Sequence, residues 1–189
     1  MENVLIVSDL ASAEKIEALI SPMGFGGEIF KVTGCVEAKK IVLTNDIDYI
    51  FINTPLPDEF GHEFAMSISS DSFASVVLFV TKELADEISD KVSKDGVFVL
   101  PKPTPQRIFL RTVHLAGALR RKVLGLKQAN IKLKTTIEQM RLIDRAKCTL
   151  IQYLNMTEKQ AHRYIEKQAM DMHTTKAEIA QGILKGGTA

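Results

Sequence analysis

DYIFINTPLPDEFG, residues 48–61, is the stretch that decides the fold. An apolar run of strand length ends at Asn53, and a loop with two prolines leads from there to Gly61. Such a run, bounded by turn residues, indicates a buried strand. Open α/β sheets bind their ligands beyond the carboxyl ends of the strands. We therefore expect Asn53 to lie at the functional edge of a sheet.

Strand and helix signals alternate on both sides of this stretch. We predict strands at residues 3–7, 28–32, 49–53, 76–81 and 97–100. Apolar residues at helical spacing lie between them, over residues 12–23, 36–45, 64–68 and 82–94. Strands that alternate with helices are joined by right-handed crossovers, which build a parallel sheet. The prediction is an α/β fold with a doubly wound, five-stranded parallel sheet.

Charge is divided unevenly between the two halves of the chain. Residues 1–100 contain seven basic and 17 acidic side chains, a formal charge of −10. Residues 101–189 contain 17 basic and six acidic side chains, a formal charge of +11. A basic half suits a polyanionic partner, although a solvated, lysine-rich helix face gives the same count.

The sequence predicts neither a metal site nor export. Cys35 and Cys148 lie far apart, and the four histidines show no metal-ligand spacing. The first residues, MENVLIVSDL, lack the basic start of a signal peptide, and no apolar run is long enough to span a membrane. We therefore expect a reduced, cytoplasmic protein without a structural metal or a cofactor.

The chain has no proline after Pro105, and its apolar residues follow a helical period. From Leu119 their spacing alternates between four and three, the heptad period of a coiled coil. The predicted dimerisation residues are Leu119, Val123, Leu126, Asn130, Leu133, Ile137 and Met140. Asn130 falls at an a position, where a buried amide favours a two-stranded pair in register. A single long helix packed on its own domain would show the same pattern.

Two capping boxes mark further helices. Thr157 with Gln160 and Thr175 with Glu178 predict helices over 158–173 and 176–184, after a long helix that ends near residue 154. One face of the first helix is predicted to be core, including Tyr164 and Met172. Its opposite side carries a basic stripe with the spacing i, i+4, i+8. The nucleic-acid-binding candidates are Arg141, Arg145, Lys147, Lys159, His162, Arg163 and Lys167, with His162 as the candidate for base stacking.

Polar residues stand at the ends of four predicted strands. They are Ser8 and Asp9, Asn53, Thr81, and Lys102 before Pro103. In this order, over residues 1–119, they resemble the receiver domain of response regulators in two-component signal transduction. That resemblance implies a pair of acids that bind Mg²⁺, a phosphoacceptor Asp at the end of the third strand, a Thr or Ser, and a Lys before a cis proline.

Two departures from the receiver pattern remove its chemistry. Asn53 stands at the acceptor position, and an amide neither attacks phosphorus nor binds Mg²⁺ as a carboxylate does. Ser8 replaces one of the two acids, so that Asp9 is left alone. The resemblance therefore predicts a pseudo-receiver with a degenerate phosphorylation site and no enzymatic activity. A nucleotide-binding enzyme is disfavoured, because the first strand–helix turn has no glycine-rich loop.

Residues 141–189 resemble the ANTAR domain, a three-helix RNA-binding module. The matching residues are Ile143, Ala146, Lys147, Leu150, Thr157, Glu158, Ala161, Ile165, Ala169, Met170, Ile179, Ala180 and Ile183. Cys148 replaces the usual glycine, and His162 replaces the usual aromatic residue. The resemblance implies a bacterial transcription antitermination regulator that binds hairpins in nascent leader RNA. The heptad spacing described above makes residues 120–140 a coiled-coil linker helix between the two domains.

Two other functions remain open. One is a signalling adaptor that docks a partner protein on the receiver-like face. The other is a DNA-binding response regulator whose last two helices imitate a helix-turn-helix, although residues 172–175 lack the usual turn glycine.

Overall fold

The computed structural model describes residues 1–186, which divide into two compact units at Gly125 and Leu126. Residues 187–189, which the sequence assigns to the C-terminal module, lie outside the described residues. Helix α5 (Gln106–Leu154) begins in the first unit and ends in the second. Each unit has its own hydrophobic core.

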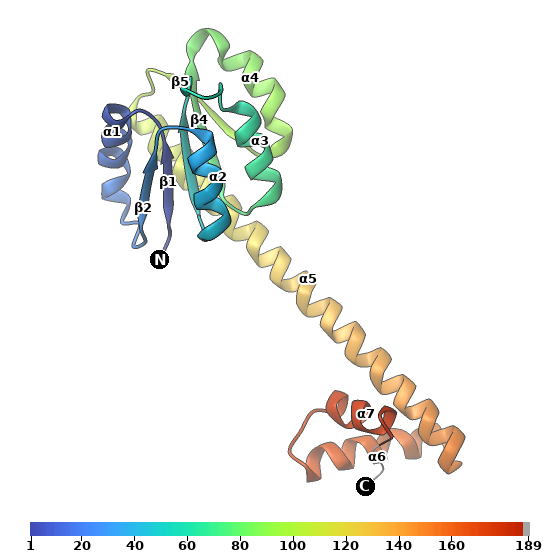
Figure 1. Cartoon of the computed structure of the whole chain (residues 1–189). Helices are drawn as coiled ribbons and strands as arrows, with labels where there is room; N and C mark the ends of the chain where they lie inside the picture. Colours follow the sequence, from blue (N-terminus) through green and yellow to red (C-terminus); the bar gives the residue numbers. More distant parts are fainter. Residues whose placement is uncertain (187–189) are drawn as a thin grey trace. The chain divides into compact units, whose positions relative to one another are not determined.

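The N-terminal unit alternates strands and helices along the chain (Figure 1). In order, its elements before α5 are β1 (Val4–Val7), α1 (Leu10–Ile20), β2 (Ile29–Val32), α2 (Cys35–Thr44), β3 (Tyr49–Asn53), α3 (His62–Asp71), β4 (Ser75–Thr81), α4 (Ala85–Val92) and β5 (Phe98–Lys102). Short 3₁₀ turns extend α1 at Ser21–Met23 and flank α4 at Lys82–Leu84 and Ser93–Asp95.

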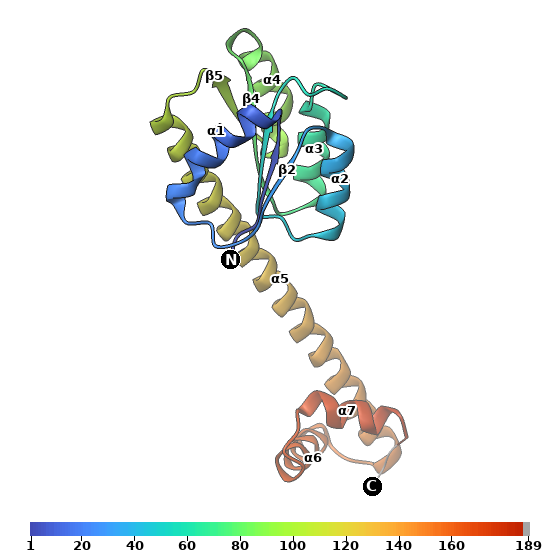
Figure 2. The ribbon, with the colours of Figure 1, turned by 60° about the vertical axis from the view of Figure 1, so that its left-hand side comes forward.

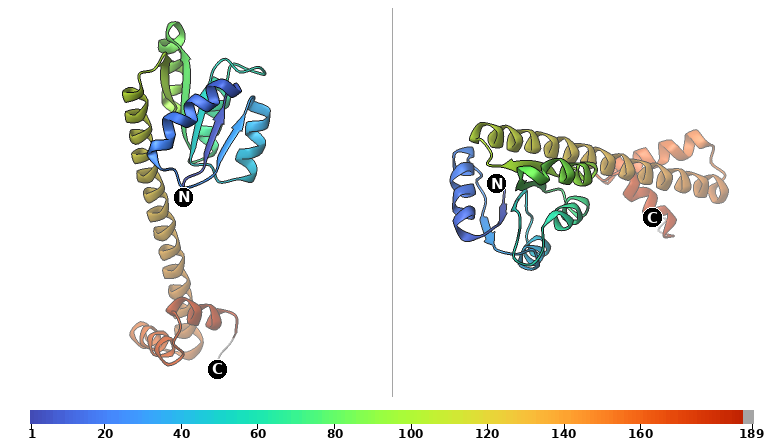
Figure 3. Two further views of the ribbon diagram at one scale, coloured as in Figure 1. Left: turned by 90° about the vertical axis from the view of Figure 1, so that its left-hand side faces the viewer. Right: turned by 90° about the horizontal axis from the view of Figure 1, so that it is seen from above.

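The five strands are all parallel and lie in the order β2-β1-β3-β4-β5. Helices α1 and α5 cover one face of the sheet, and α2, α3 and α4 cover the other (Figures 2 and 3). Successive residues of a strand therefore enter different cores, as the pleat requires. In β1, Val4 and Ile6 face the core beneath α1 and α5, whereas Leu5 and Val7 face the core beneath α2 and α3.

The predicted α/β fold and parallel sheet are confirmed, and the differences lie at the ends of elements, such as α3, which is longer than the predicted 64–68. Strand β5 runs on through Pro101 to Lys102, beyond the predicted end at residue 100. Lys102 is thereby paired in register with Thr81 at the end of β4. The helix predicted over residues 82–94 is a shorter α4 between two 3₁₀ turns.

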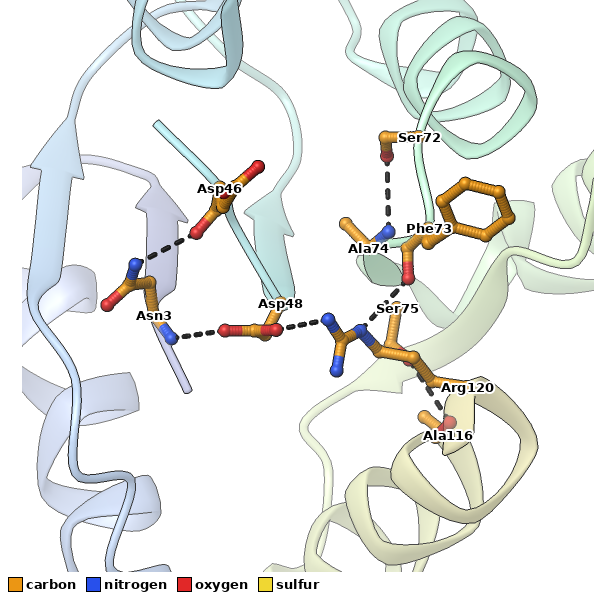
Figure 4. Close-up of polar contacts among 9 residues, drawn as sticks. All are labelled: Asn3, Asp46, Asp48, Ser72, Phe73, Ala74, Ser75, Ala116 and Arg120. Atoms are coloured by element: carbon orange, nitrogen blue, oxygen red, sulfur yellow. Dashed lines mark hydrogen bonds and ion pairs between the residues drawn. The ribbon is translucent and has the colours of Figure 1, made fainter. Parts of the chain in front are cut away.

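At the amino edge of the sheet, α5 is fastened by polar contacts (Figure 4). Arg120 forms an ion pair with Asp48, and both side chains are largely buried. The Nε of Arg120 also donates to the carbonyl of Phe73 at 3.0 Å. Ser75 donates through its hydroxyl to the carbonyl of Ala116 at 3.1 Å. These bonds cross from helix to sheet, so the helix is fixed in its position on the first unit.

The C-terminal unit consists of the end of α5, α6 (Glu158–Asp171) and α7 (Lys176–Leu184) around a small core. Both predicted capping boxes are formed, by Thr157 at α6 and Thr175 at α7. The core contains Ala146, Leu150, Ala161, Ile165 and Ala180. Small residues predominate there, which lets α6, α7 and the end of α5 approach closely.

The prediction that Met172 belongs to the core is wrong. Helix α6 ends at Asp171, and Met172 is the cap residue beyond it, with an exposed side chain. The 3.6-residue period that places a side chain on the buried face applies only while the helix continues. Tyr164, on the same predicted face, packs against the core as expected.

Candidate functional site

The predicted polar residues meet at the carboxyl edge of the sheet. Because all five strands are parallel, β1, β3 and β5 end at the same edge of the sheet. Lys102 Nζ donates to Asn53 Oδ1 at 2.9 Å, and Asn53 Nδ2 donates to Ser8 Oγ at 3.0 Å. Ser8 Oγ in turn donates to Asp9 Oδ2 at 3.4 Å. A chain of hydrogen bonds thus links a lysine to a carboxylate through a neutral amide and a hydroxyl.

Asn53 uses both ends of its amide in this chain. Its Nδ2 donates to Ser8, while its Oδ1 accepts from Lys102. A carboxylate has no N–H and could not make the contact with Ser8 in the same way. The residue at the end of β3 is therefore integrated as an amide, with both functions satisfied inside the site.

Asp9 is occupied as the cap of α1. Its Oδ1 accepts from the backbone N–H of Ser12 at 2.9 Å. This bond stabilises the ionised form, and together with the contacts to the Ser12 and Ser8 side chains it holds the pKa of Asp9 below its ordinary value. Asp9 is thus a negative charge that is committed to the helix N-terminus.

Lys102 reaches inward from the end of β5. Besides Asn53 it donates to the backbone carbonyl of Thr54. Burial lowers the pKa of Lys102, and the nearby charge of Asp9 acts in the opposite direction. The hydrogen-bond partners of its ammonium are both neutral oxygens.

The remaining strand-end residue, Thr81, has an exposed side chain and makes no hydrogen bond to Asn53 or Lys102 within residues 1–186. No cluster of three His, Cys, Asp or Glu side chains that could hold a metal ion occurs in that range either. The arrangement offers positive charge and hydrogen-bond donors, but no carboxylate at the position of a nucleophile.

The basic candidates of the C-terminal unit fall into two groups. Lys147 is engaged: its ammonium contacts Asp144 at 2.9 Å and Glu158 at 3.0 Å, and these bonds raise its pKa. His162 contacts Glu166 at 3.3 Å, and Glu166 is also paired with Lys176. Both candidates are therefore tied to carboxylates of their own chain.

The other basic candidates are exposed and pair with no carboxylate among the described residues. They are Arg141 and Arg145 on α5, and Lys159, Arg163 and Lys167 on α6. Long cationic side chains without an intramolecular partner can bind phosphate groups without first breaking an ion pair. The basic stripe on α6 is therefore exposed, and its charges are not neutralised by carboxylates of the described residues.

Sequence reasoning missed Tyr153. It lies near the end of α5 and is 74% exposed, far more than an aromatic side chain in a core. It follows Arg145 by eight residues, so these two side chains lie within about a quarter turn of one another around the helix. That spacing was present in the sequence and identifies Tyr153 as a second candidate for base stacking, beside His162.

The heptad residues of α5 are all exposed, including Asn130. In the N-terminal unit, Leu119 and Val123 line a cavity of about 500 Å³ together with Phe73. The apolar heptad side chains from Leu126 to Met140, called the seam below, are exposed and belong to no hydrophobic core of the described residues. A helix with such a stripe is suited to pair with a second helix.

Comparison with known proteins matches the C-terminal part of the chain to a known domain family. The family model of the ANTAR domain matches residues 132–184. The transcriptional regulatory protein PdtaR of Mycobacterium tuberculosis is 25% identical over 149 residues, which cover 79% of this chain and 73% of PdtaR. The match is the same in two strains of that organism.

Solved structures resemble the N-terminal part. A response regulator receiver domain protein from Clostridium thermocellum has a TM-score of 0.56 at 19% identity, over 66% of this chain and 99% of that one. A two-component response regulator from Clostridium difficile has a TM-score of 0.54 at 22% identity, over 65% and 98%. At these identities the likeness establishes the receiver fold. No helix within residues 1–186 is both long and apolar enough to cross a membrane.

Proposed function

We propose that this chain, which carries a C-terminal ANTAR domain behind a domain of the receiver fold, regulates transcription by binding hairpins in nascent leader RNA. Binding would stabilise an antiterminator structure and let the polymerase continue. The observation that carries the proposal is the ANTAR match over residues 132–184, a range that includes five exposed basic side chains, on α5 and α6, that pair with no carboxylate among the described residues. No catalytic step is assigned to the chain.

The charge of the C-terminal half supports this reading. Phosphate groups supply most of the affinity of nucleic acids for proteins, and residues 101–189 carry a formal charge of +11. Lys159, Arg163 and Lys167 are the candidates for phosphate contact, joined by Arg141 and Arg145 on α5. Tyr153 and His162 are the candidates for stacking on unpaired bases of a loop.

The receiver-like domain is proposed to act without phosphorylation. Asn53 offers no nucleophilic carboxylate, and Asp9 is held by the N-terminus of α1. Its input would then be the binding of a molecule or a protein.

The chain is also proposed to form a homodimer through the heptad residues from Leu119 to Met140. Their exposure supports this, since an unpartnered apolar seam on a helix is unfavourable in water. Two ANTAR domains in one dimer would allow two hairpins, or two parts of one RNA, to be bound together.

The test is a salt titration of binding to an RNA hairpin with an unpaired loop, beside a DNA duplex of equal length. The logarithm of affinity should fall with the logarithm of salt concentration by about 0.7 to 0.9 for each phosphate contacted. Replacing Arg163 and Lys167 by alanine should weaken binding and make the slope shallower by about 1.4 to 1.8.

A matched control removes the same net charge elsewhere. Lys40 and Lys94 are exposed lysines of the N-terminal unit without ion pairs among the described residues, and their replacement by alanine should leave the slope unchanged. If the Arg163 and Lys167 variant keeps affinity and slope while circular dichroism shows it folded, the stripe is only a solvated face. Tighter binding of the DNA duplex than of the hairpin would favour a DNA-binding regulator instead.

A further inference from the structure

A cavity of about 210 Å³ opens beside the hydrogen-bonded Asn53 and Lys102. It lies within the N-terminal unit, between α1 and the start of α5, at the carboxyl edge where parallel α/β sheets bind ligands. At roughly 30 Å³ for each water molecule of the liquid, this volume matches that of a small organic molecule. Nothing in the proposed RNA binding or dimerisation uses it.

Much of the cavity lining is apolar. Phe79 of β4, Phe109 of α5, and Ile16 and Leu19 of α1 all line it. Phe79 and Phe109 are 5% and 0% exposed, and their rings stack on one another at 5.8 Å between centroids. Packed aromatic side chains form a rigid surface, so an apolar ligand group can bind there without ordering the wall first.

The cavity lining also carries positive charge. Lys102 and Lys15 both line it, and no Asp or Glu is among the lining residues. Lys102 Nζ bonds to the Asn53 amide and the Thr54 carbonyl, both neutral, so one of its three N–H groups is left for another acceptor. Lys15 forms no ion pair among the described residues. The nearest carboxylate, Asp9, is bound to the N-terminus of α1.

We propose that this cavity binds a small amphipathic carboxylate. The carboxylate would lie between Lys102 and Lys15, and an aromatic or branched apolar body would lie against Phe79 and Phe109. A carboxylate would give the third N–H of Lys102 a charged acceptor, in a place where burial already disfavours an isolated ammonium. Such a ligand also contacts α5 through Phe109, the element that continues toward the ANTAR domain.

The test uses the full chain and three probes of related shape. Benzoate has both the ring and the charge, benzyl alcohol has the ring alone, and acetate has the charge alone. Titration followed by ¹H–¹⁵N chemical shifts reports both affinity and location. For a ligand of this size a Kd on the order of 1 mM is an ordinary value, and we expect benzoate to bind at least about tenfold more tightly than either control.

Two variants test the charged and the apolar parts of the cavity lining separately. Lys15→Met should weaken benzoate about fivefold and leave benzyl alcohol unchanged, because this lysine is exposed on α1 and carries only charge to the site. Leu19→Trp should fill the apolar side and weaken both ligands. Lys40→Met, on α2 at the other face of the sheet, should change neither.

We expect the largest changes in chemical shift at the backbone amides of Ser12, Phe79 and Thr104, which line the cavity. Equal affinity for benzoate and benzyl alcohol, or benzoate-induced shifts that map elsewhere, would overturn the proposal. Benzoate binding that Lys15→Met and Lys40→Met reduce alike would show only nonspecific attraction of an anion, and would overturn it as well. None of these results depends on RNA binding, so the two proposals are tested separately.

Discussion

At the scale of single residues, the amide of Asn53 has nearly the shape of a carboxylate but a different set of hydrogen bonds. It donates to Ser8 and accepts from Lys102, and it carries no charge. A carboxylate at the same place would gain an ion pair with Lys102 but lose the donor that holds Ser8. Adding one negative charge therefore changes the site electrostatically without rebuilding it.

Incubation with acetyl phosphate and Mg²⁺ should leave the wild-type chain unmodified. Asn53→Asp should take up a phosphoryl group only weakly, because Ser8 leaves the metal site one carboxylate short. Adding Ser8→Asp to Asn53→Asp should increase the yield. The readout is a hydroxylamine-labile mass increase of one phosphoryl group. A hydroxylamine-labile phosphoryl group on the wild-type chain would contradict the prediction, since that chain has Asn53 and no carboxylate at the end of β3.

Asp9 should contribute to stability in a pH-dependent way. Its folded pKa lies below the unfolded value of about 3.9, so its contribution is complete above that value and is lost as the pH falls through the folded pKa. Asp9→Ala should lower the free energy of unfolding by about 1 kcal/mol at pH 7, and by less below about pH 4. Asp9→Asn keeps a capping oxygen and should retain most of the stability. Denaturant titrations at several pH values measure this, and a loss in Asp9→Ala that is constant down to low pH would refute it.

At the scale of helices, Lys147 connects α5 with α6. Its ammonium lies between Asp144 on its own helix and Glu158 in the first turn of the next. This position predicts a structural role, in contrast to the unpaired Arg163 on the exposed side of α6. The two residues have the same charge, so they can be compared directly.

Lys147→Met should make α6 open more easily, by about 1 kcal/mol or less, because surface ion pairs contribute little each. It should change the salt dependence of hairpin binding little. Arg163→Ala should leave the opening of α6 unchanged and should weaken RNA binding. Native-state amide exchange on α6 and the salt titration measure the two effects. If Lys147→Met reduced the salt slope as much as Arg163→Ala, Lys147 would be a phosphate contact after all.

Much of the fold follows from local patterns in the sequence. The buried strands are continuous apolar runs, and Thr157 and Thr175 specify two helix starts through short-range bonds. The extension of β5 to Lys102 could not be predicted in this way, because Pro101 lowers strand propensity and only the pairing with β4 keeps it extended. Local rules describe an element well except where tertiary contacts determine its end.

The sequence indicates which polar residues stand at strand ends, but not the bonds among them. The strand order brings Ser8, Asn53 and Lys102 together, whereas the alternation of strands and helices predicts only that the sheet is parallel. That Asn53 donates to Ser8 depends on side-chain positions that local spacing does not specify. The contact of Lys147 with Glu158 spans a turn between two helices, so helical spacing gives no sign of it.

At the scale of the whole molecule, the exposed seam of α5 predicts a dimer. Leu126→Glu with Leu133→Glu should give a folded monomer, because charges at d positions oppose pairing. The matched control is Gln128→Glu with Thr135→Glu, at f positions on the far side of the same helix. Sedimentation of the three chains at tens of micromolar distinguishes them. A monomeric wild-type chain under these conditions, or a control as dissociated as the seam variant, would contradict the prediction.

The hydrogen-bonded amide at the end of β3 has a consequence for timing. An acyl phosphate preserves a signal until it is hydrolysed, whereas the proposed phosphorylation-independent site at Asn53 would hold no covalent record of an earlier stimulus. The duration of an input at this edge would then equal the residence time of whatever is bound there. For a ligand with a Kd of about 100 μM and an association rate constant of about 10⁶ M⁻¹s⁻¹, that time is about 10 ms. This is far shorter than the synthesis of a leader transcript, so such a regulator would respond to the ligand concentration of the moment.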